Sequence, residues 1–301
     1  MPSPPGDTPG TGRADHGAVG HDRHMGAASR ERFADVVRMG GAAGDPDDVR
    51  LDLALLLIAA EALPDDVSGD TLDTLLAHGL AELDALAATV PDDGRDDQRL
   101  RAALGGFGGE SSDYARLESS LLTDVLRSRR GLPILLSSVW TEVARRAEVP
   151  AYGVGLPGHF VVGVGDPDGN RVLVDPFAGG RLLPYDTARS IAERTGRSLK
   201  PEHLRPHDPI DTVDRVLSNI RAWATTPERG WHRLWTVELA LLLPRHDLGL
   251  AREHGEALIA VGRYGEASRV LEAYAETVQG PMPLEAEHAR RVARQARARL
   301  N

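Results

Sequence analysis

One stretch of the chain, residues 127–177, constrains the fold most, because it combines an almost wholly apolar helix with two strands. The helix is expected to begin at a Gly-Leu-Pro segment ending in Pro133, since proline in a first turn sacrifices no hydrogen bond. Arg145 and Arg146 are expected to return it to solvent, and Pro150 to prevent its continuation. Its apolar positions are Ile134, Leu135, Leu136, Val139, Trp140, Val143, Ala144 and Ala147. They leave almost no polar face in the first two turns, so the sequence predicts a buried helix.

Two short strands are expected after this helix, at residues 159–164 and 171–175, because apolar residues alternate in the first and the second ends in Asp-Pro-Phe. The intervening Gly-Asp-Pro-Asp-Gly-Asn is dense in turn-forming residues. In a hairpin symmetric about Pro167, His159 lies directly opposite Asp175, with Cβ atoms roughly 4.5–5.5 Å apart. A slip of one residue would place the two side chains on opposite faces.

A buried helix, then a histidine, then an aspartate is the order found in papain-like and transglutaminase-like sites, where a helix-end cysteine is activated by the histidine. The segments RRGLP, PGHF and DPFAGG resemble those of the bacterial transglutaminase-like family of the SirB type, over roughly residues 50–275. The resemblance implies an α+β fold. A papain/transglutaminase-like core, in which a central buried helix packs on a small antiparallel sheet, would be flanked by helical N-terminal and TPR-like helical C-terminal regions.

The position that the resemblance assigns to the nucleophile does not carry one. Matched by spacing, the family's cysteine falls on Pro133, the base on His159 and the orienting acid on Asp175. Proline cannot attack a substrate, and the chain contains no cysteine. Ser137 and Ser138 lie one turn further on, and Ser137 is expected to bond back to the Pro133 carbonyl. His159 and Asp175 are therefore interpreted as the remnant of a catalytic dyad. A structural hydrogen bond, a binding role and acid–base catalysis all stay open for the histidine.

Three hypotheses for the function follow. The first is a non-catalytic protein that binds a peptide or protein partner through a cleft at His159 and Asp175. The second is a cysteine-independent hydrolase of amides or esters, in which His159 is the general base and backbone N–H groups at the helix start stabilise the oxyanion. The third is a helical TPR-like scaffold with an inert core. The residues predicted to bind a ligand are Pro133, Phe160, Phe177, Gly179 and Gly180.

Composition predicts a disordered tail at 1–29, and the helical pattern predicts a helical region at 30–110. The resemblance implies the core at 111–207 and a helical TPR-like region at 208–301. The histidines of the tail are expected to be solvated rather than bound to a metal. A glycine-rich segment at 105–109 is expected to be a flexible loop, and it lacks the lysine of a phosphate-binding loop.

Charge and hydropathy limit the classes of partner. The formal net charge is −10, which argues against nucleic acid as the main partner. The longest apolar run, residues 53–60, is too short to span a membrane, and no apolar segment of a signal peptide is visible. We expect a cytoplasmic protein without a cofactor or metal, and the oligomeric state stays open.

Overall fold

The fold is described from a computed structural model, which places residues 26–39, 49–63 and 69–300. The tail histidines His16, His21 and His24 lie outside these ranges, so their expected solvation stays a prediction. Helix α1, Gly26–Met39, begins inside the segment that the sequence assigned to the tail.

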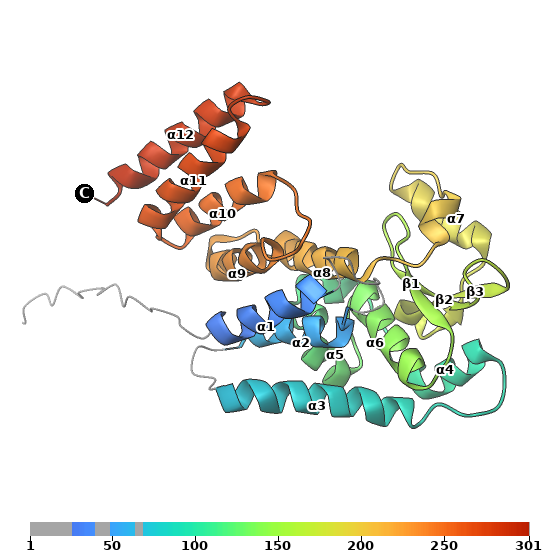
Figure 1. Cartoon of the computed structure of the whole chain (residues 1–301). Helices are drawn as coiled ribbons and strands as arrows, with labels where there is room; N and C mark the ends of the chain where they lie inside the picture. The colour runs from blue at the N-terminus through green and yellow to red at the C-terminus, as the bar shows by residue number, and fades with distance from the viewer. Residues whose placement is uncertain (1–25, 40–48, 64–68, 301) are drawn as a thin grey trace, which may run out of the picture.

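Helices make up the N-terminal part of the chain, as expected. After α1 these are α2 (Leu51–Glu61), α3 (Gly69–Ala87), α4 (Asp96–Leu104) and α5 (Leu122–Ser128), with short 3₁₀ turns η2 (Ser111–Ala115) and η3 (Glu118–Ser120) before α5. Helix α2 contacts α1, α3, α5, α6 and α8, and Figure 1 shows it between α1 and α5, above α3. Its apolar run at 54–60 is buried throughout, which explains why this stretch is apolar on every face.

The helix predicted to be central is α6, Pro133–Arg146, and its first eight residues are all buried. It contacts the helices α2, α3, α4, α5 and α8 as well as strands β1 and β2. The expectation that Arg146 returns to solvent was wrong. Its guanidinium bonds the fully buried carboxylate of Asp52 at 2.5 Å, together with Asp84 at 2.7 Å and Glu142 at 2.7 Å. A buried carboxylate requires a counter-charge, and Arg146 provides one across the α2–α6 contact.

The strands form a four-stranded antiparallel sheet in the order β1-β2-β3-β4. Their bounds are β1 Ala151–Val154, β2 Val161–Gly165, β3 Arg171–Asp175 and β4 Arg181–Leu182, with a 3₁₀ turn η4 (Pro176–Ala178) between the last two. The expected strands correspond to β2 and β3, whereas β1 and β4 were not predicted. The α+β expectation is confirmed, with the small sheet lying against a predominantly helical structure.

The register of the β2–β3 hairpin differs by two residues from the one expected. Val162 lies opposite Val174, whereas symmetry about Pro167 would have placed it opposite Val172. The hairpin is centred one residue later because Gly165 adopts φ +107° and the Asp166 N–H donates to the Asn170 carbonyl at 3.1 Å. Since side chains alternate with a period of two, this shift leaves every residue on its expected face.

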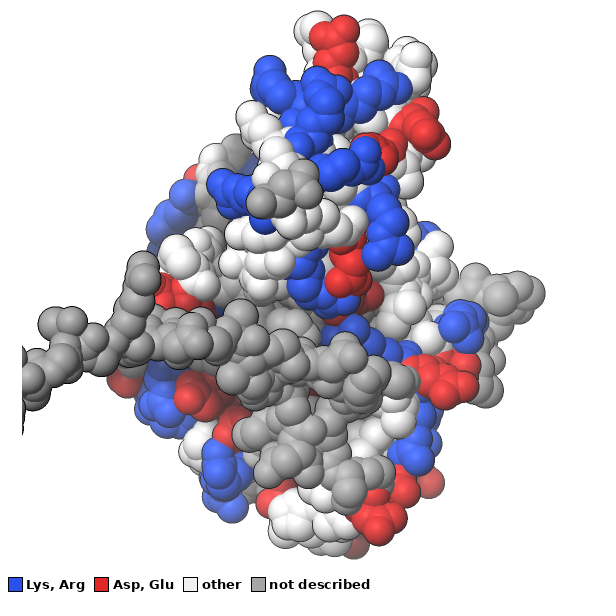
Figure 2. Space-filling model, turned by 90° about the vertical axis from the view of Figure 1, so that its left-hand side faces the viewer, with Lys and Arg blue, Asp and Glu red and all other residues white. Residues whose placement is uncertain are grey.

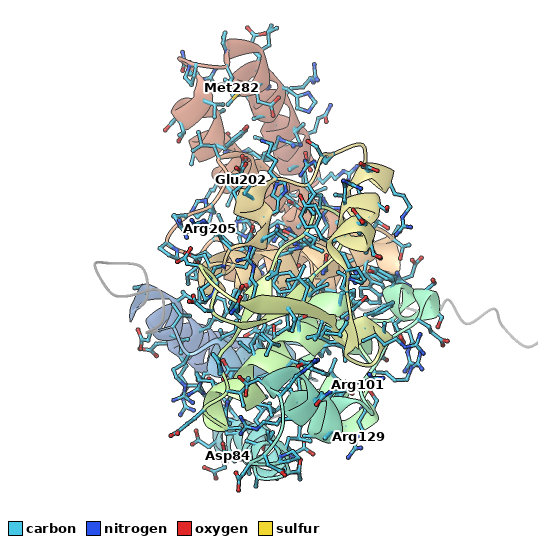
Figure 3. All side chains as sticks on the ribbon, turned by 90° about the vertical axis from the view of Figure 1, so that its right-hand side faces the viewer. Asp84, Arg101, Arg129, Glu202, Arg205 and Met282 are labelled. Carbon is cyan, nitrogen blue, oxygen red and sulfur yellow. The ribbon has the colours of Figure 1, made fainter. Side chains whose placement is uncertain are left out.

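The C-terminal part is helical: α7 (Tyr185–Arg194), η5 (Pro201–Leu204), α8 (Pro209–Trp223), η6 (Pro227–Arg229), α9 (Gly230–Ala240), α10 (Gly249–Ala260), α11 (Tyr264–Val278) and α12 (Pro283–Ala298). From α9 to α12 each helix packs on the one before it, and α8 also contacts α2 and α6. Figure 1 shows α10, α11 and α12 stacked beyond α9, and Figure 3 shows Asp84 and Met282 at opposite ends of the molecule. Among the described helices, none is both long and apolar enough to cross a membrane.

Candidate functional site

His159 and Asp175 are in contact despite the shifted register. The Nε2 atom of His159 lies 3.0 Å from Oδ2 of Asp175, and their side chains are 12% and 13% exposed. His159 precedes β2 and Asp175 ends β3, so the two are diagonal rather than directly opposite neighbours. A long side chain such as histidine can bridge a diagonal pair on one face. The predicted contact therefore exists, but it is reached from a different register.

Both members of the pair are fixed by further hydrogen bonds. The second oxygen of Asp175, Oδ1, accepts the Phe177 N–H at 3.0 Å and caps η4. The His159 carbonyl accepts from Nη2 of Arg215 on α8 at 2.9 Å, and its N–H donates to the Leu156 carbonyl at 3.1 Å. The pair is thus held between the sheet and α8.

Phe177 supports the pair from the side of η4. Its ring makes edge contacts with His159, at a centroid distance of 6.1 Å, and with Tyr114, at 6.3 Å. The Gly109 N–H donates to the Phe177 carbonyl at 3.0 Å, and a Cβ on Gly109 would lie 2.1 Å from the Phe177 ring. The expectation of a flexible loop at 105–109 was therefore wrong, since the loop packs against η4 and its glycine permits the close approach.

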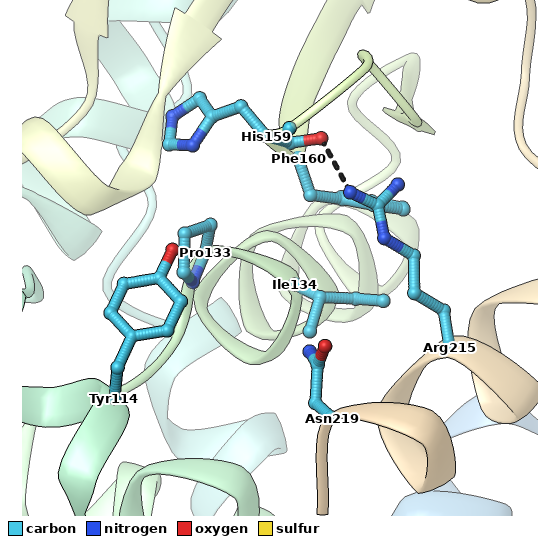
Figure 4. A pocket seen from close by; sticks show the side chains of 8 residues that line it. Tyr114, Pro133, Ile134, His159, Phe160, Arg215 and Asn219 are labelled. Carbon is cyan, nitrogen blue, oxygen red and sulfur yellow. Dashed lines mark hydrogen bonds between the residues drawn. The ribbon is translucent and has the colours of Figure 1, made fainter. Parts of the chain in front are cut away.

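A pocket of about 210 Å³ opens beside His159. Its walls come from η2, from the start of α6, from the loop before β2 and from α8 (Figure 4). The lining residues are Tyr114, Pro133, Ile134, Gly158, His159, Phe160, Arg215 and Asn219. Figure 4 shows His159 and Tyr114 on the Pro133 side of the pocket, and Arg215 and Asn219 on the Ile134 side.

The pocket includes only some of the residues predicted to bind. Pro133 and Phe160 line it, whereas Phe177, Gly179 and Gly180 lie outside its lining. The two glycines have positive φ angles of 69° and 71° after η4, and a Cβ on Gly180 would lie 2.1 Å from the Trp140 ring. The structure therefore gives Gly180 a packing reason to be glycine.

The start of α6, which lines the pocket through Pro133 and Ile134, has backbone donors without an acceptor among the described residues. Pro133 is the first helical residue, and the Leu132 position provides no side-chain cap. The N–H of Leu136 donates to the Leu132 carbonyl at 3.0 Å, but the N–H groups of Ile134 and Leu135 have no acceptor among the described residues. This is the ordinary condition of a helix N-terminus, which carries a partial positive charge.

Neither candidate serine faces the pocket. The Ser137 hydroxyl donates to the Phe160 carbonyl at 3.3 Å, so the expected bond to the Pro133 carbonyl was wrong. The back-bond to the preceding turn is made instead by Ser138, which donates to the Ile134 carbonyl at 2.8 Å. Both side chains are buried, because β2 packs directly on this face of α6.

The charged and titratable groups around the pocket influence one another. Partial burial raises the pKa of Tyr114, while the charge of Arg215 opposes that rise and the charge of Asp175 adds to it. Burial lowers the pKa of Arg215. Burial, and to a smaller extent the charge of Arg215, lowers the pKa of His207. The centre of the His207 ring lies 5.1 Å from that of the Phe160 ring. Within the described ranges no group of three His, Cys, Asp or Glu side chains has the arrangement of a metal site.

Comparison with known proteins agrees with this geometry. Residues 77–218 match the family model described as the transglutaminase-like superfamily. Over these residues the chain is similar to transglutaminase-like proteins. The match runs from α3 into α8 and includes every residue lining the pocket except Asn219, one position beyond it.

The chain is also similar to bacterial proteins called UPF0162. It is 28% identical to one from Xylella fastidiosa over 240 residues, covering 76% of this chain and 84% of the relative. It is 32% identical to UPF0162 protein PA3419 of Pseudomonas aeruginosa over 179 residues, covering 56% and 62%. It is 26% identical to UPF0162 protein YchA of Escherichia coli K12 over 208 residues, covering 66% and 76%. These similarities support a bacterial transglutaminase-like family.

Five residues that line the pocket were not predicted as site residues: Tyr114, Ile134, Gly158, Arg215 and Asn219. Arg215 and Asn219 are four positions apart and so share one face of α8, but nothing local in the sequence indicates that this face meets the His159 loop. The aromatic residue at 114 stands in a short segment without periodicity, so it gave no signal either.

Proposed function

We propose that this chain is a non-catalytic transglutaminase-like protein, of the SirB type, that binds a peptide or protein segment in the pocket beside His159 and Asp175. The C-terminal helices would provide a second contact surface of TPR-like character.

The observation that carries the proposal is the chemistry of the pocket lining. Pro133 stands at the helix end, where the resemblance expects the nucleophile, and it lines the pocket. The hydroxyls of Ser137 and Ser138 are committed elsewhere. Tyr114 has a raised pKa, so its phenol stays protonated at neutral pH and is a poor nucleophile. A ligand in this pocket would meet the imidazole of His159, whose partner Asp175 lies outside the lining, but no activated nucleophile.

The dimensions of the pocket support a peptide segment over a large ligand. At about 210 Å³ it is smaller than the roughly 300–1,000 Å³ typical of pockets for drug-sized molecules. Apolar side chains of Pro133, Ile134 and Phe160 form part of the wall, with polar groups at His159 and Asn219. This combination suits one or two side chains of an inserted peptide.

The helices α10 to α12 support a second contact surface of TPR-like character. A Cβ on Gly255 of α10 would lie 2.4 Å from the Leu271 side chain of α11, so the glycine permits close helix packing. Gly262, with φ +82°, lies in the turn between the two helices. Small residues at such positions are what a tetratricopeptide unit uses to pack antiparallel helices.

The proposal is tested by selecting peptides from a displayed random hexapeptide library and measuring the binding of synthetic copies by fluorescence polarisation. We expect a His159→Ala, Asp175→Ala double variant to lose about tenfold or more in affinity, equivalent to about 1.4 kcal/mol. The control is an Asp186→Ala, Arg189→Ala variant, which removes an exposed ion pair on α7. It should bind like the unaltered chain.

Equal binding to all three proteins would contradict the proposed cleft. Mass spectrometry of the same peptides decides between binding and chemistry. Cleavage that disappears in His159→Ala would support the alternative, a hydrolase in which His159 acts as general base.

A further inference from the structure

We propose that the group recognised in this pocket is a single carboxylate of the bound peptide, held between Arg215 and the N-terminus of α6. This inference rests on the proposed peptide-binding function and specifies the chemistry of its ligand.

Arg215 is a cation without a counter-ion among the described residues. Its Nη2 donates to the His159 carbonyl at 2.9 Å and lies 3.5 Å from the Leu156 carbonyl, while its guanidinium carbon lies 5.2 Å from the centre of the Phe160 ring. None of the ion pairs formed by the described residues includes it. Carbonyls and an aromatic face position the guanidinium without neutralising it.

Some other partly buried arginines of the described residues are neutralised by carboxylates. Arg146 contacts Asp52 and Glu142, and Arg30 contacts Glu61 and Glu238. A partly buried charge that lacks a partner is unfavourable, and an anionic ligand would offset that cost. Arg171 and Arg229 also have no ion pair among the described residues, so what distinguishes Arg215 is that it lines the pocket.

The N-terminus of α6 adds positive potential at the same pocket. Pro133 and Ile134, the first two residues of this 14-residue helix, line the pocket, and the N–H groups of Ile134 and Leu135 have no acceptor in the described part of the chain. Helix N-termini favour anions through these free donors and through the helix dipole. Two independent features, a side-chain cation and a helix end, therefore converge on one cavity.

The remaining polar groups favour a monoanion over phosphate. Tyr114 and Asn219 carry neutral hydrogen-bond donors, and Tyr114 stays protonated at neutral pH. The carboxylate of Asp175 is close enough for its charge to raise the pKa of Tyr114. One guanidinium can balance one carboxylate, whereas a dianionic phosphate would leave a negative charge uncompensated beside Asp175.

The test is an amide-detected NMR titration of the full chain with N-acetylglycine and with its neutral counterpart, N-acetylglycinamide. We expect N-acetylglycine to shift the backbone signals of Ile134 and Leu135 and the Nε signal of Arg215 in a saturable way. N-acetylglycinamide should leave all three unchanged. Because these signals are read in the unaltered chain, the result does not depend on whether a variant folds.

Two further ligands and two variants complete the experiment. N-acetylglutamic acid α-amide carries only a side-chain carboxylate, so stronger binding of this compound would support the inference and identify an acidic side chain as the source. Stronger binding of N-acetylglycine would identify a chain end. Arg215→Gln should weaken binding of the preferred carboxylate by about tenfold or more. The control, Arg189→Gln on α7, should not.

The inference is overturned if inorganic phosphate binds more tightly than either carboxylate, or if acid and amide shift the same signals equally. It is also overturned, while the proposed function survives, if selected hexapeptides need His159 and Asp175 yet bind equally as C-terminal amides and to Arg215→Gln. Selected peptides that need neither His159 and Asp175 nor Arg215 would contradict both.

Discussion

Gly180→Ala should destabilise the protein more than an otherwise similar substitution at Gly196. Both glycines have left-handed backbones, with φ +71° and φ +76°. A Cβ on Gly180 would lie 2.1 Å from the Trp140 ring, while a Cβ on Gly196 would have no neighbour within 4 Å. The pair therefore separates the cost of the backbone conformation from the cost of the contact.

The magnitude follows from these two contributions. An L side chain in the left-handed region costs about 1–2 kcal/mol, which applies to both variants. Forcing a methyl group against a fully buried tryptophan adds about 1–3 kcal/mol of overpacking, which applies only at Gly180. We expect losses in the free energy of unfolding of about 2–5 kcal/mol for Gly180→Ala and about 1–2 kcal/mol for Gly196→Ala.

Urea unfolding followed by both far-UV circular dichroism and tryptophan fluorescence measures the two losses. Coincident transitions are required before the free energies are compared. Equal losses in the two variants would refute the argument that the Trp140 contact, rather than a ligand, requires glycine at position 180.

Three more perturbations test other contacts. Asp52→Asn should lower the free energy of unfolding by about 2–3 kcal/mol in urea, less than the 3–5 kcal/mol of a broken isolated pair, because Glu142 and Asp84 still contact Arg146. Burial lowers the pKa of His207, so below pH 6.5 the unfolded chain binds more protons than the folded chain. The free energy of unfolding should therefore fall there by up to about 1.4 kcal/mol per pH unit. His207→Gln should flatten that slope, as measured by urea titrations at several pH values. Asp175→Ala should cost about 1–3 kcal/mol, because bonds to His159 and to the η4 backbone are lost together; an unchanged melting temperature would contradict this.

The sequence predicted the central helix and hairpin because their signals are local. An almost unbroken apolar run starting at Pro133 requires a buried helix, and the turn-rich residues before Arg171 require a reversal of the chain. The hairpin register was wrong by two residues, since it depended on the backbone of Gly165. The contact of His159 with Asp175 was still predicted, because a shift of two residues preserves the face.

The missed features depend on contacts between distant segments. The Arg215 guanidinium contacts carbonyls that lie 56 and 59 positions earlier in the chain, and the periodicity of the sequence does not indicate such a contact. The orientation of Ser137 depends on how α6 is rotated against β2, which the helical pattern alone does not give. Arg146 was expected at the surface because its partner Asp52 lies 94 positions away.

Affinity selection coupled to mass spectrometry tests the central claim most directly, because it reads binding and turnover in one sample. A mixture of hexapeptides with free carboxyl and amidated C-termini would be incubated with the unaltered chain and with Arg215→Gln. The masses of the retained and the free peptides would then be measured. We predict enrichment of carboxylate-bearing peptides by the unaltered chain only, with every peptide mass unchanged. Shortened, deamidated or cross-linked peptides, or equal retention of both kinds by both proteins, would contradict the account.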